Sequence, residues 1–397
     1  MSLVQTMAKG VPLWKIRREI DRAIQKLKRP FSRVYDPFFQ RFYDRDWQNK
    51  IQVIAGDVVL GDKLAILLIF QPTKLRAFTR ETCDHLIGKG YAPLVVSNSP
   101  ISSSDIEELK PAFWNVVIRP NFGYDFGGYR DGLRFIESLG LVPSRILILN
   151  DSIWYPTLAD ETLISQMETT KADLVGSLYQ EGDATLSKKS SRRNGFIESF
   201  FYLVNGSCLQ TPAFKRFWKS YRLSNLKYNA VYDGERQFSS QMQSAGLKVE
   251  SIVSRSRFLS ELSVQKPAFI RQVLNYSAYT NMEFSERCQA LLLKYSESNQ
   301  WKECALAHIE KVSAKHHFHS SFFLATMTLL GASFLKKGSG TVLAKGYGLL
   351  HHEMRTQYLR AIGDGVLPSP PPAIYKEISD LQAALAKSLP THVVQLQ

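Results

Sequence analysis

Short apolar segments that alternate with helical segments constrain the fold of this chain more than any other feature. Residues 64–70 (LAILLIF) form a continuous apolar run, which is typical of a strand buried on both faces of a parallel sheet. Alternating strands and helices predict an α/β sandwich with a mainly parallel sheet, which binds ligands at the carboxyl ends of its strands. Further strands are expected at 92–96, 116–119, 145–150, 173–176 and 200–204, and helices at 72–86, at 128–139 and from the capping box Ser104-x-x-Glu107.

The pattern becomes helical beyond about residue 263. Phe322–Leu335 comes nearest to a membrane span but is too short, and it predicts a buried helix. Three regions are therefore expected: a basic helical arm (1–57), an α/β domain (58–262) and a helical domain (263–397). Candidate helices of the last region lie near 284–296, 300–314, 318–335, 340–361 and 373–388.

The N-terminal arm has the pattern of a basic amphipathic helix. Apolar residues recur at spacings of three and four residues, and lysines and arginines fill the other faces. Residues 13–29 therefore predict either a helix that lies on an anionic membrane surface or a helix docked on the protein with its basic side in water. The apolar positions are Leu13, Ile16, Ile20, Ile24 and Leu27, and the basic ones are Lys15, Arg17, Arg18, Arg22, Lys26 and Lys28.

Composition narrows the class of partner. The 397 residues are 44% apolar and 22% charged, which excludes wholesale disorder, and the net charge of +14 indicates phosphate-bearing partners. No nucleic-acid-binding motif is present, so nucleic acid is not an expected partner. Four cysteines without metal-ligand spacing, and an N-terminus without a signal peptide, predict reduced thiols and a cytoplasmic protein.

Several common catalytic motifs are missing from the sequence. It contains no G-x-G-x-x-G, no G-x-x-x-x-G-K-[ST] and no G-x-S-x-G, which argues against Rossmann dinucleotide, P-loop and α/β-hydrolase sites. The histidines at 316, 317, 319, 351 and 352 are expected on packed or solvated helices. Metal binding there is the weaker interpretation, because no carboxylate or cysteine lies at ligand spacing in the sequence.

Residues 119–131 (RPNFGYDFGGYRD) are the first candidate site, since they follow a strand and precede a helix. Arg119 and Arg130 are expected to donate to phosphate, and Asp125 to accept from a sugar or base. The alternative is a tight turn whose aspartate caps the helix. Donor-binding candidates in this segment are Arg119, Asn121, Gly123, Asp125, Gly128, Arg130 and Asp131.

Asn150-Asp151-Ser152 is the second candidate site, directly after the strand 145–150. A carboxylate at the end of a buried strand can hold Mg²⁺ on a diphosphate, because Mg²⁺ commonly takes only one or two protein carboxylates. Asp151 is therefore the candidate metal ligand. An Asx-turn that closes the strand explains the same residues equally well.

Asp233-Gly234-Glu235 is the third candidate site. One of its two carboxylates could act as the general base that takes a proton from an acceptor hydroxyl. From the residues alone, helix capping is the stronger interpretation.

Taken in order, these segments resemble the rhamnan synthesis protein F family, bacterial glycosyltransferase-like proteins of polysaccharide assembly. The resemblance covers about residues 60–260. Family members often carry Gln-Ser where this chain has Glu198-Ser199, which leaves the role of position 198 open. The matching residues are Asn121, Gly123 to Asp125, Gly127 to Leu133, Asn150 to Ser152, Pro156, Glu198 to Phe201, Phe214, Phe217, Trp218, Glu235 and Gly246.

The resemblance implies a GT-A-like fold that binds a nucleotide-sugar at its strand ends. It also implies an inverting displacement with Glu235, or else Asp233, as the base. In GT-A enzymes an Asp-x-Asp holds Mg²⁺ or Mn²⁺, and here the corresponding place has Asp151 without the second carboxylate. Metal dependence therefore stays open.

The resulting hypothesis is a glycosyltransferase on the inner face of the cytoplasmic membrane. It would move a sugar, rhamnose by the family's name, onto a lipid-linked or polymeric glycan of the cell surface, such as a lipopolysaccharide O-antigen. The alternative is a non-catalytic glycan- or nucleotide-binding subunit. Residues 182–194, with four basic side chains, predict either a lid over the donor or a solvated loop.

Overall fold

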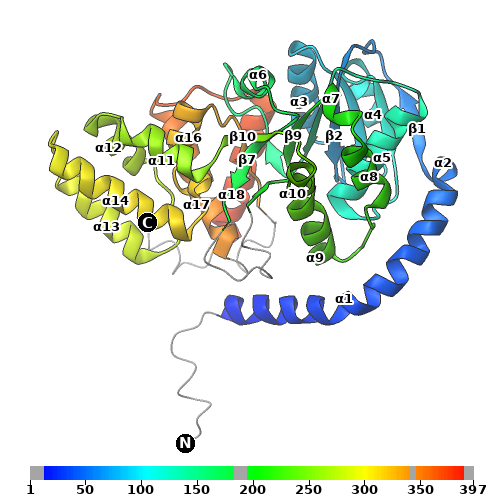
Figure 1. The fold of residues 1–397 in the computed structure, drawn as a ribbon. Helices are drawn as coiled ribbons and strands as arrows, with labels where there is room; N and C mark the ends of the chain where they lie inside the picture. Colours follow the sequence, from blue (N-terminus) through cyan, green and yellow to red (C-terminus); the bar gives the residue numbers. More distant parts are fainter. Residues whose placement is uncertain (1–12, 183–194, 339–345, 389–397) are drawn as a thin grey trace, which may run out of the picture.

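A mixed nine-stranded sheet forms the centre of the structure, a computed structural model that describes residues 13–182, 195–338 and 346–388 (Figure 1). The strand order is β1-β4-β3-β2-β5-β9-β7-β10, and β8 pairs with β7. The bounds are β1 (Gln52–Ala55), β2 (Lys63–Ile69), β3 (Ala92–Ser97), β4 (Asn115–Ile118), β5 (Arg145–Asn150), β7 (Leu174–Gln180), β8 (Phe196–Ile197), β9 (Phe201–Asn205) and β10 (Val249–Val253).

Six of the nine strands run in the same direction, and β1, β8 and β9 run the opposite way. β4, β3, β2 and β5 pair in parallel, as do β7 and β10, whereas β9 runs antiparallel between β5 and β7. All six strands expected from the apolar runs are present, and the predicted α/β fold with a mainly parallel sheet is confirmed. β9 begins where β5 ends, because the two strands run in opposite directions, so the residues just before β9 lie at the same edge as the end of β5.

Helices cover both faces of the sheet. Alternate side chains of β2 enter two hydrophobic clusters: Leu67 and Ile69 face one side, and Ile66 and Leu68 face the other. The first cluster includes side chains of α3 (Ala77–Gly88), α4 (Ser103–Leu109) and α6 (Leu163–Thr169). It also includes side chains of later helices: α11 (Arg255–Ser263), α12 (Pro267–Asn275), α13 (Met282–Leu293), α14 (Asn299–Lys315) and α16 (Phe323–Leu330). The second cluster includes α5 (Tyr124–Ser138), α7 (Gly206–Leu209), α8 (Pro212–Ser220) and α10 (Arg236–Ser244).

The C-terminal helices share the main hydrophobic core with the α/β region. One cluster joins Leu67 of β2 to Trp301 and Ile309 of α14, so the core continues across the boundary expected at residue 263. A third cluster joins Trp154 to Tyr358 and Ile378. The elements concerned are β6 (Ile153–Trp154), β11 (Leu335–Lys336), which pairs with β6, α17 (Gly346–Gly363) and α18 (Pro372–Ser388).

Several element boundaries differ from the sequence expectations. The cap of α4 is Ser102, whose Oγ accepts from the Asp105 amide, rather than Ser104. α5 begins four residues earlier than expected, at Tyr124. The long helix expected at 318–335 is two helices: the first ends at Ser321, and the second ends at Leu330, before Gly331, which adopts a positive φ. The remaining short elements are α2 (Trp47–Lys50), η1 (Lys110–Ala112), α9 (Lys227–Asn229), η2 (Ala230–Glu235) and α15 (Phe318–Ser321).

Most of the N-terminal arm is one long helix, α1 (Leu13–Arg45), that lies along the outside of the molecule (Figure 1), whereas residues 52–55 of the arm form β1 of the sheet. Pro30 and Pro37 each remove a helix hydrogen bond, and the helix curves. Within the described ranges no helix is both long enough and apolar enough to cross a membrane. All four cysteines are free thiols, and three of them are buried.

Candidate functional site

Polar side chains from distant parts of the sequence gather at the carboxyl edge of β2 and β5. We name the group the strand-end cluster. Its members are Asp125, Tyr129, Asn150, Asp151, Ser152, Glu198, Ser199, Glu235, Lys336 and Lys337.

A chain of hydrogen bonds connects two of its carboxylates. The Asn150 amide donates to the Asp125 carboxylate (3.2 Å) and lies 2.8 Å from the Tyr129 hydroxyl. Tyr129 in turn donates to the backbone carbonyl of Ser199. The backbone amide and hydroxyl of Ser199 both donate to Glu235, at 2.8 and 3.1 Å. The second and third sequence motifs therefore meet through Tyr129 and Ser199, as strand ends at one sheet edge allow.

Asp151 is anchored from the end of β2. One carboxylate oxygen accepts from the Phe70 amide (3.0 Å) and from the Gln71 side chain (3.1 Å). Gln71 also lines a hollow of about 290 Å³ at the ends of β2 and β3. Asp151 thus lies beside a space between two strand ends, where sheets of this kind bind ligands.

Two lysines that the sequence analysis did not select complete the cluster. β11 carries Lys336 and is followed by Lys337, and its pairing with β6 brings both to the site. Lys336 forms an ion pair with Glu198, and Lys337 lies 3.9 Å from Glu377. A cationic pair at this edge is suited to phosphate, but only the tertiary fold brings these lysines to the motifs.

Burial and neighbouring charges shift several pKa values here. Burial raises the pKa of Asp125 to about 6, with a further contribution from the charge of Asp151. Burial likewise raises the pKa of Asp151 and of Glu235. Burial lowers the pKa of Lys337 to about 8, against the opposing effect of the Glu377 and Asp151 carboxylates. Groups that titrate near neutral pH are typical of functional sites.

The expectation that Arg119 and Asp131 bind the donor is wrong. Their side chains are fully buried as an ion pair with a separation of 2.5 Å. Arg119 also donates to Asn98 and to the Phe122 carbonyl, and the Tyr43 hydroxyl of α1 donates to Asp131. This pair stabilises the fold, because its donors are engaged inside the protein.

Arg130, which was also expected to donate to phosphate, is bound to another part of the protein. Its guanidinium makes a bidentate contact with Asp44 of α1, at 2.7 and 2.9 Å. Gly128 is a packing position, since a Cβ there would lie 2.3 Å from Leu68. Gly123 has φ +89° and directly precedes α5. Its amide donates to Asn225, and Asn121 is exposed on the loop before it.

Asp233 and Glu235, the two candidates for a general base, point to different places. Glu235 contacts Ser199 within the cluster. Asp233 lies 3.7 Å from Arg29 of α1 and lines a separate hollow beside that helix. Only Glu235 is positioned with the other candidate residues.

Histidines 317 and 319 form a further group next to the cluster. Their ring nitrogens and the Glu198 carboxylate lie within 4.8 Å of one another. The sequence could not reveal this, because the carboxylate comes from the loop before β9 and the histidines from α15 and its cap. Residues 183–194, the core of the expected basic loop, lie outside the described residues.

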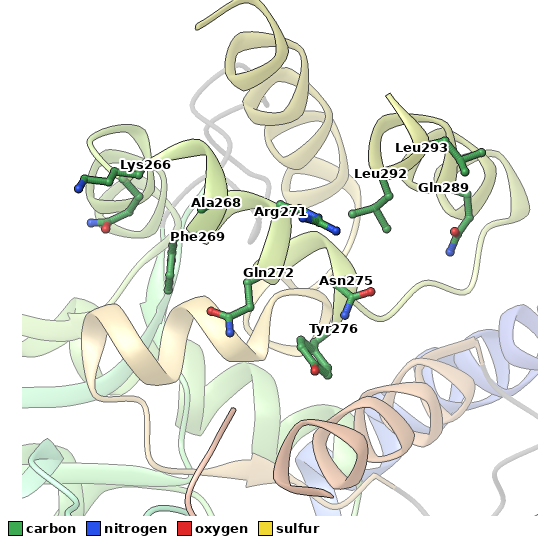
Figure 2. A pocket seen from close by; sticks show the side chains of 11 residues that line it. Lys266, Ala268, Phe269, Arg271, Gln272, Asn275, Tyr276, Gln289, Leu292 and Leu293 are labelled. Carbon is green, nitrogen blue, oxygen red and sulfur yellow. The ribbon is translucent and has the colours of Figure 1, made fainter. Parts of the chain in front are cut away.

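A hollow of about 900 Å³ lies elsewhere, between α12 and α13 (Figure 2). Arg271, Gln272, Asn275 and Tyr276 of the α12 segment face it across from Leu292 of α13. Lys266 and Arg271 are its charged residues, and none of the motif residues lines it. It is therefore a separate surface feature of the helical region.

Comparison with known proteins identifies relatives. The model of the rhamnan synthesis protein F family matches residues 94–331. The uncharacterized protein y4gN of Sinorhizobium fredii is 28% identical over 262 residues, which are 66% of this chain and 67% of that protein. A mannosyltransferase of Pyrobaculum calidifontis, solved with GDP-Man and Mn²⁺, aligns over 86% of this chain and 99% of its own, with 9% identity and a TM-score of 0.30.

Proposed function

The chain belongs to the rhamnan synthesis protein F family, and from this we propose that it is a GT-A-like glycosyltransferase that uses a nucleotide-sugar donor. The observation that carries the proposal is the strand-end cluster, in which Asp125, Asn150 and Glu235 are joined by one chain of hydrogen bonds. The acceptor is a lipid-linked or polymeric glycan of the bacterial cell surface. Rhamnose as the sugar rests on the family name.

We assign the donor to the edge between β2 and β3. The hollow beside Gln71 suits the nucleoside, and the diphosphate then lies near Asp151. Lys336 and Lys337 take the part in neutralising phosphate that the sequence assigned to Arg119 and Arg130. Charge stabilisation of this kind is often the largest single contribution to catalysis.

The residues present fit a divalent cation on the diphosphate. Asp125 supplies the second carboxylate that Asn150-Asp151-Ser152 lacks, and the charge of Asp151 contributes to the raised pKa of Asp125. Mg²⁺ or Mn²⁺ bound there would neutralise charge on the leaving diphosphate. The dependence of activity on such a cation is part of the proposal.

Glu235 is the proposed base of an inverting displacement. Its carboxylate takes the proton of the acceptor hydroxyl, the acceptor oxygen forms a bond to the anomeric carbon, and the bond to the diphosphate oxygen breaks. Burial raises the pKa of Glu235 toward the range that suits a base at neutral pH. The two hydrogen bonds from Ser199 hold its orientation.

A non-catalytic subunit that binds glycan or nucleotide is the second candidate function. The observation that favours it is Asn150-Asp151-Ser152, which carries one carboxylate where GT-A enzymes carry the two of Asp-x-Asp. In this case the same edge would bind nucleotide without turnover. Turnover of a donor by the purified chain discriminates between the two functions.

We further propose that α1 holds the enzyme on an anionic membrane surface, at the inner face of the cytoplasmic membrane. The structure extends the stripe expected at 13–29 as far as Phe42. Nine large apolar side chains of α1 remain 43–72% exposed, with Lys28, Arg41 and Arg45 beside or among them at helical spacing. They are Ile20, Ile24, Leu27, Phe31, Val34, Tyr35, Phe38, Phe39 and Phe42.

The opposite side of α1 is the one that docks on the protein. Gln40 bonds to the backbone of Tyr221 and of Leu223, each at 2.9 Å, and Asp44 binds Arg130. These contacts orient α1 so that its apolar stripe faces away from the protein. The sequence analysis expected a docked helix to keep its basic side in water. Here Gln40 and Asp44 dock on the protein, and the proposed membrane contact is made by the apolar face.

Release of nucleoside diphosphate tests the main proposal. A panel of nucleotide-sugars is incubated with the full chain and Mg²⁺, Mn²⁺ or a chelator, with Asp151→Ala as the comparison. We expect release from one donor, lost with Asp151→Ala and reduced by the chelator. If no donor is turned over with a glycan acceptor present, but one binds, the non-catalytic function replaces the proposal. Absence of both binding and release would refute a nucleotide-sugar site.

A further inference from the structure

Three metal-binding side chains meet beside the strand-end cluster. Glu198, His317 and His319 place their ligand atoms within 4.8 Å of one another. We propose that they bind one divalent transition-metal ion, with Zn²⁺ as the first choice. This site is distinct from the proposed cation at Asp125 and Asp151 and does not depend on the proposed activity.

His319 gives the first argument for the site. The side chain is buried, and neither ring nitrogen has a hydrogen-bond partner among the described residues. A buried polar group without a partner is costly, and such groups in folded proteins usually have one. Burial holds the pKa of His319 well below its usual range, so the imidazole is neutral, which is the form that binds metals.

Glu198 supplies the negative charge. It is 4% exposed and forms an ion pair with Lys336, which favours the charged form of the carboxylate. The carboxylate is therefore ionised at neutral pH, as a ligand must be. The Gln180 amide contacts both Glu198 (2.5 Å) and His317 (3.3 Å), in the manner of an outer partner that orients ligands.

The ligand types decide the class of ion. Two imidazoles and one carboxylate suit Zn²⁺ and leave coordination positions open, whereas Mg²⁺ prefers oxygen ligands. Bond lengths of about 2.0–2.2 Å put ligand atoms roughly 3.3 Å apart around a tetrahedral ion. An ion bound there would therefore draw the three groups, now within 4.8 Å of one another, closer together.

Lys336 competes with the ion, because its ammonium already pairs with Glu198. A metal ion at Glu198 would weaken that pair by repulsion between cations. The ammonium also interacts with Asp125, toward which it would then be attracted. Replacement of Lys336 by methionine should accordingly raise Zn²⁺ affinity, by about tenfold or more if the repulsion exceeds 1.4 kcal/mol.

Titration of the full chain with Zn²⁺ tests the site. The protein, purified without a histidine tag and stripped with chelator, is titrated by calorimetry, and Co²⁺ absorbance reports the geometry. We expect one ion per chain. Glu198→Gln and His319→Gln should each weaken binding by more than the roughly 10–100-fold that loss of an outer partner costs. Cys304→Ser, which removes an exposed thiol away from the site, is the matched control and should bind as the parent does.

Unchanged Zn²⁺ affinity in both ligand variants would overturn the assignment, as would the absence of binding by the parent chain. Circular dichroism confirms that each variant is folded, and if His319→Gln does not fold, Glu198→Gln together with Lys336→Met decides. Opposite changes in those two variants support the site. The readout is affinity rather than turnover, so failure here leaves the proposed transferase intact.

Discussion

The strand-end cluster and α1 differ in the side chains that they present. The cluster collects carboxylates and lysines at the sheet edge and links them by hydrogen bonds. α1 contacts the protein through Gln40 and Asp44 and leaves an apolar stripe exposed. The first arrangement suits a small polar ligand and the second an apolar surface. Substrate chemistry and membrane attachment should therefore be separable by mutation.

The largest expected effect concerns the base. Glu235→Gln should lower turnover of the donor with acceptor by about 10²–10⁴-fold, because the amide cannot take the acceptor proton. Asp233→Asn is the matched comparison, two residues away, and should stay within about twofold, because Asp233 faces Arg29 rather than the cluster. Steady-state rates of both variants give the measurement. Equal losses of turnover in the two variants would show that Glu235 is not the specific base.

The next expected effect is on the pH profile of kcat/KM. Activity should fall below pH about 6, where Asp125 gains a proton and loses its charge, and above pH about 8, where Lys337 loses its proton and its charge. Lys337→Arg keeps the charge and should extend the alkaline limb. An unaltered alkaline limb in that variant would remove Lys337 from the phosphate-binding group.

Membrane attachment is tested on α1. Phe31→Ser with Phe38→Ser should weaken binding to anionic vesicles by about tenfold or more, because full burial of one Phe contributes roughly 1.5–3 kcal/mol. Turnover of donor with a water-soluble acceptor should not change. Leu139→Ser with Val142→Ser, which alters apolar residues exposed elsewhere, is the control. If both pairs bind vesicles equally well, the stripe does not mediate attachment.

The sequence predicted the part of the cluster that follows from strand topology. Parallel strands end at one edge, so residues directly after them, such as Asn150 and Asp151, had to lie near one another and near the start of the next helix at Asp125. Glu235 was selected through the family resemblance. Its contact with Ser199 depends on the antiparallel β9, which no local pattern indicates.

What the sequence missed depends on contacts between distant segments. A sequence shows that Arg119 and Arg130 are charged, but not that Asp131 and Asp44 neutralise them. The lysines of β11 reach the cluster only through pairing with β6. The two faces of α1 are likewise undetermined, because the same helical periodicity results whether the apolar side meets protein or lipid.

The smallest expected effect concerns Tyr43, through which α1 contacts the ion pair of Arg119 and Asp131. The Tyr43 hydroxyl donates to the buried Asp131 carboxylate, which forms an ion pair with Arg119. Tyr43→Phe removes one hydrogen bond to a buried carboxylate and should lower the free energy of unfolding by about 1–3 kcal/mol, measured by chemical denaturation. Donor affinity and vesicle binding should both remain at the parent level, because the ring still packs between the two regions. A selective loss of donor affinity at unchanged stability would instead return Arg119 and Asp131 to the donor site.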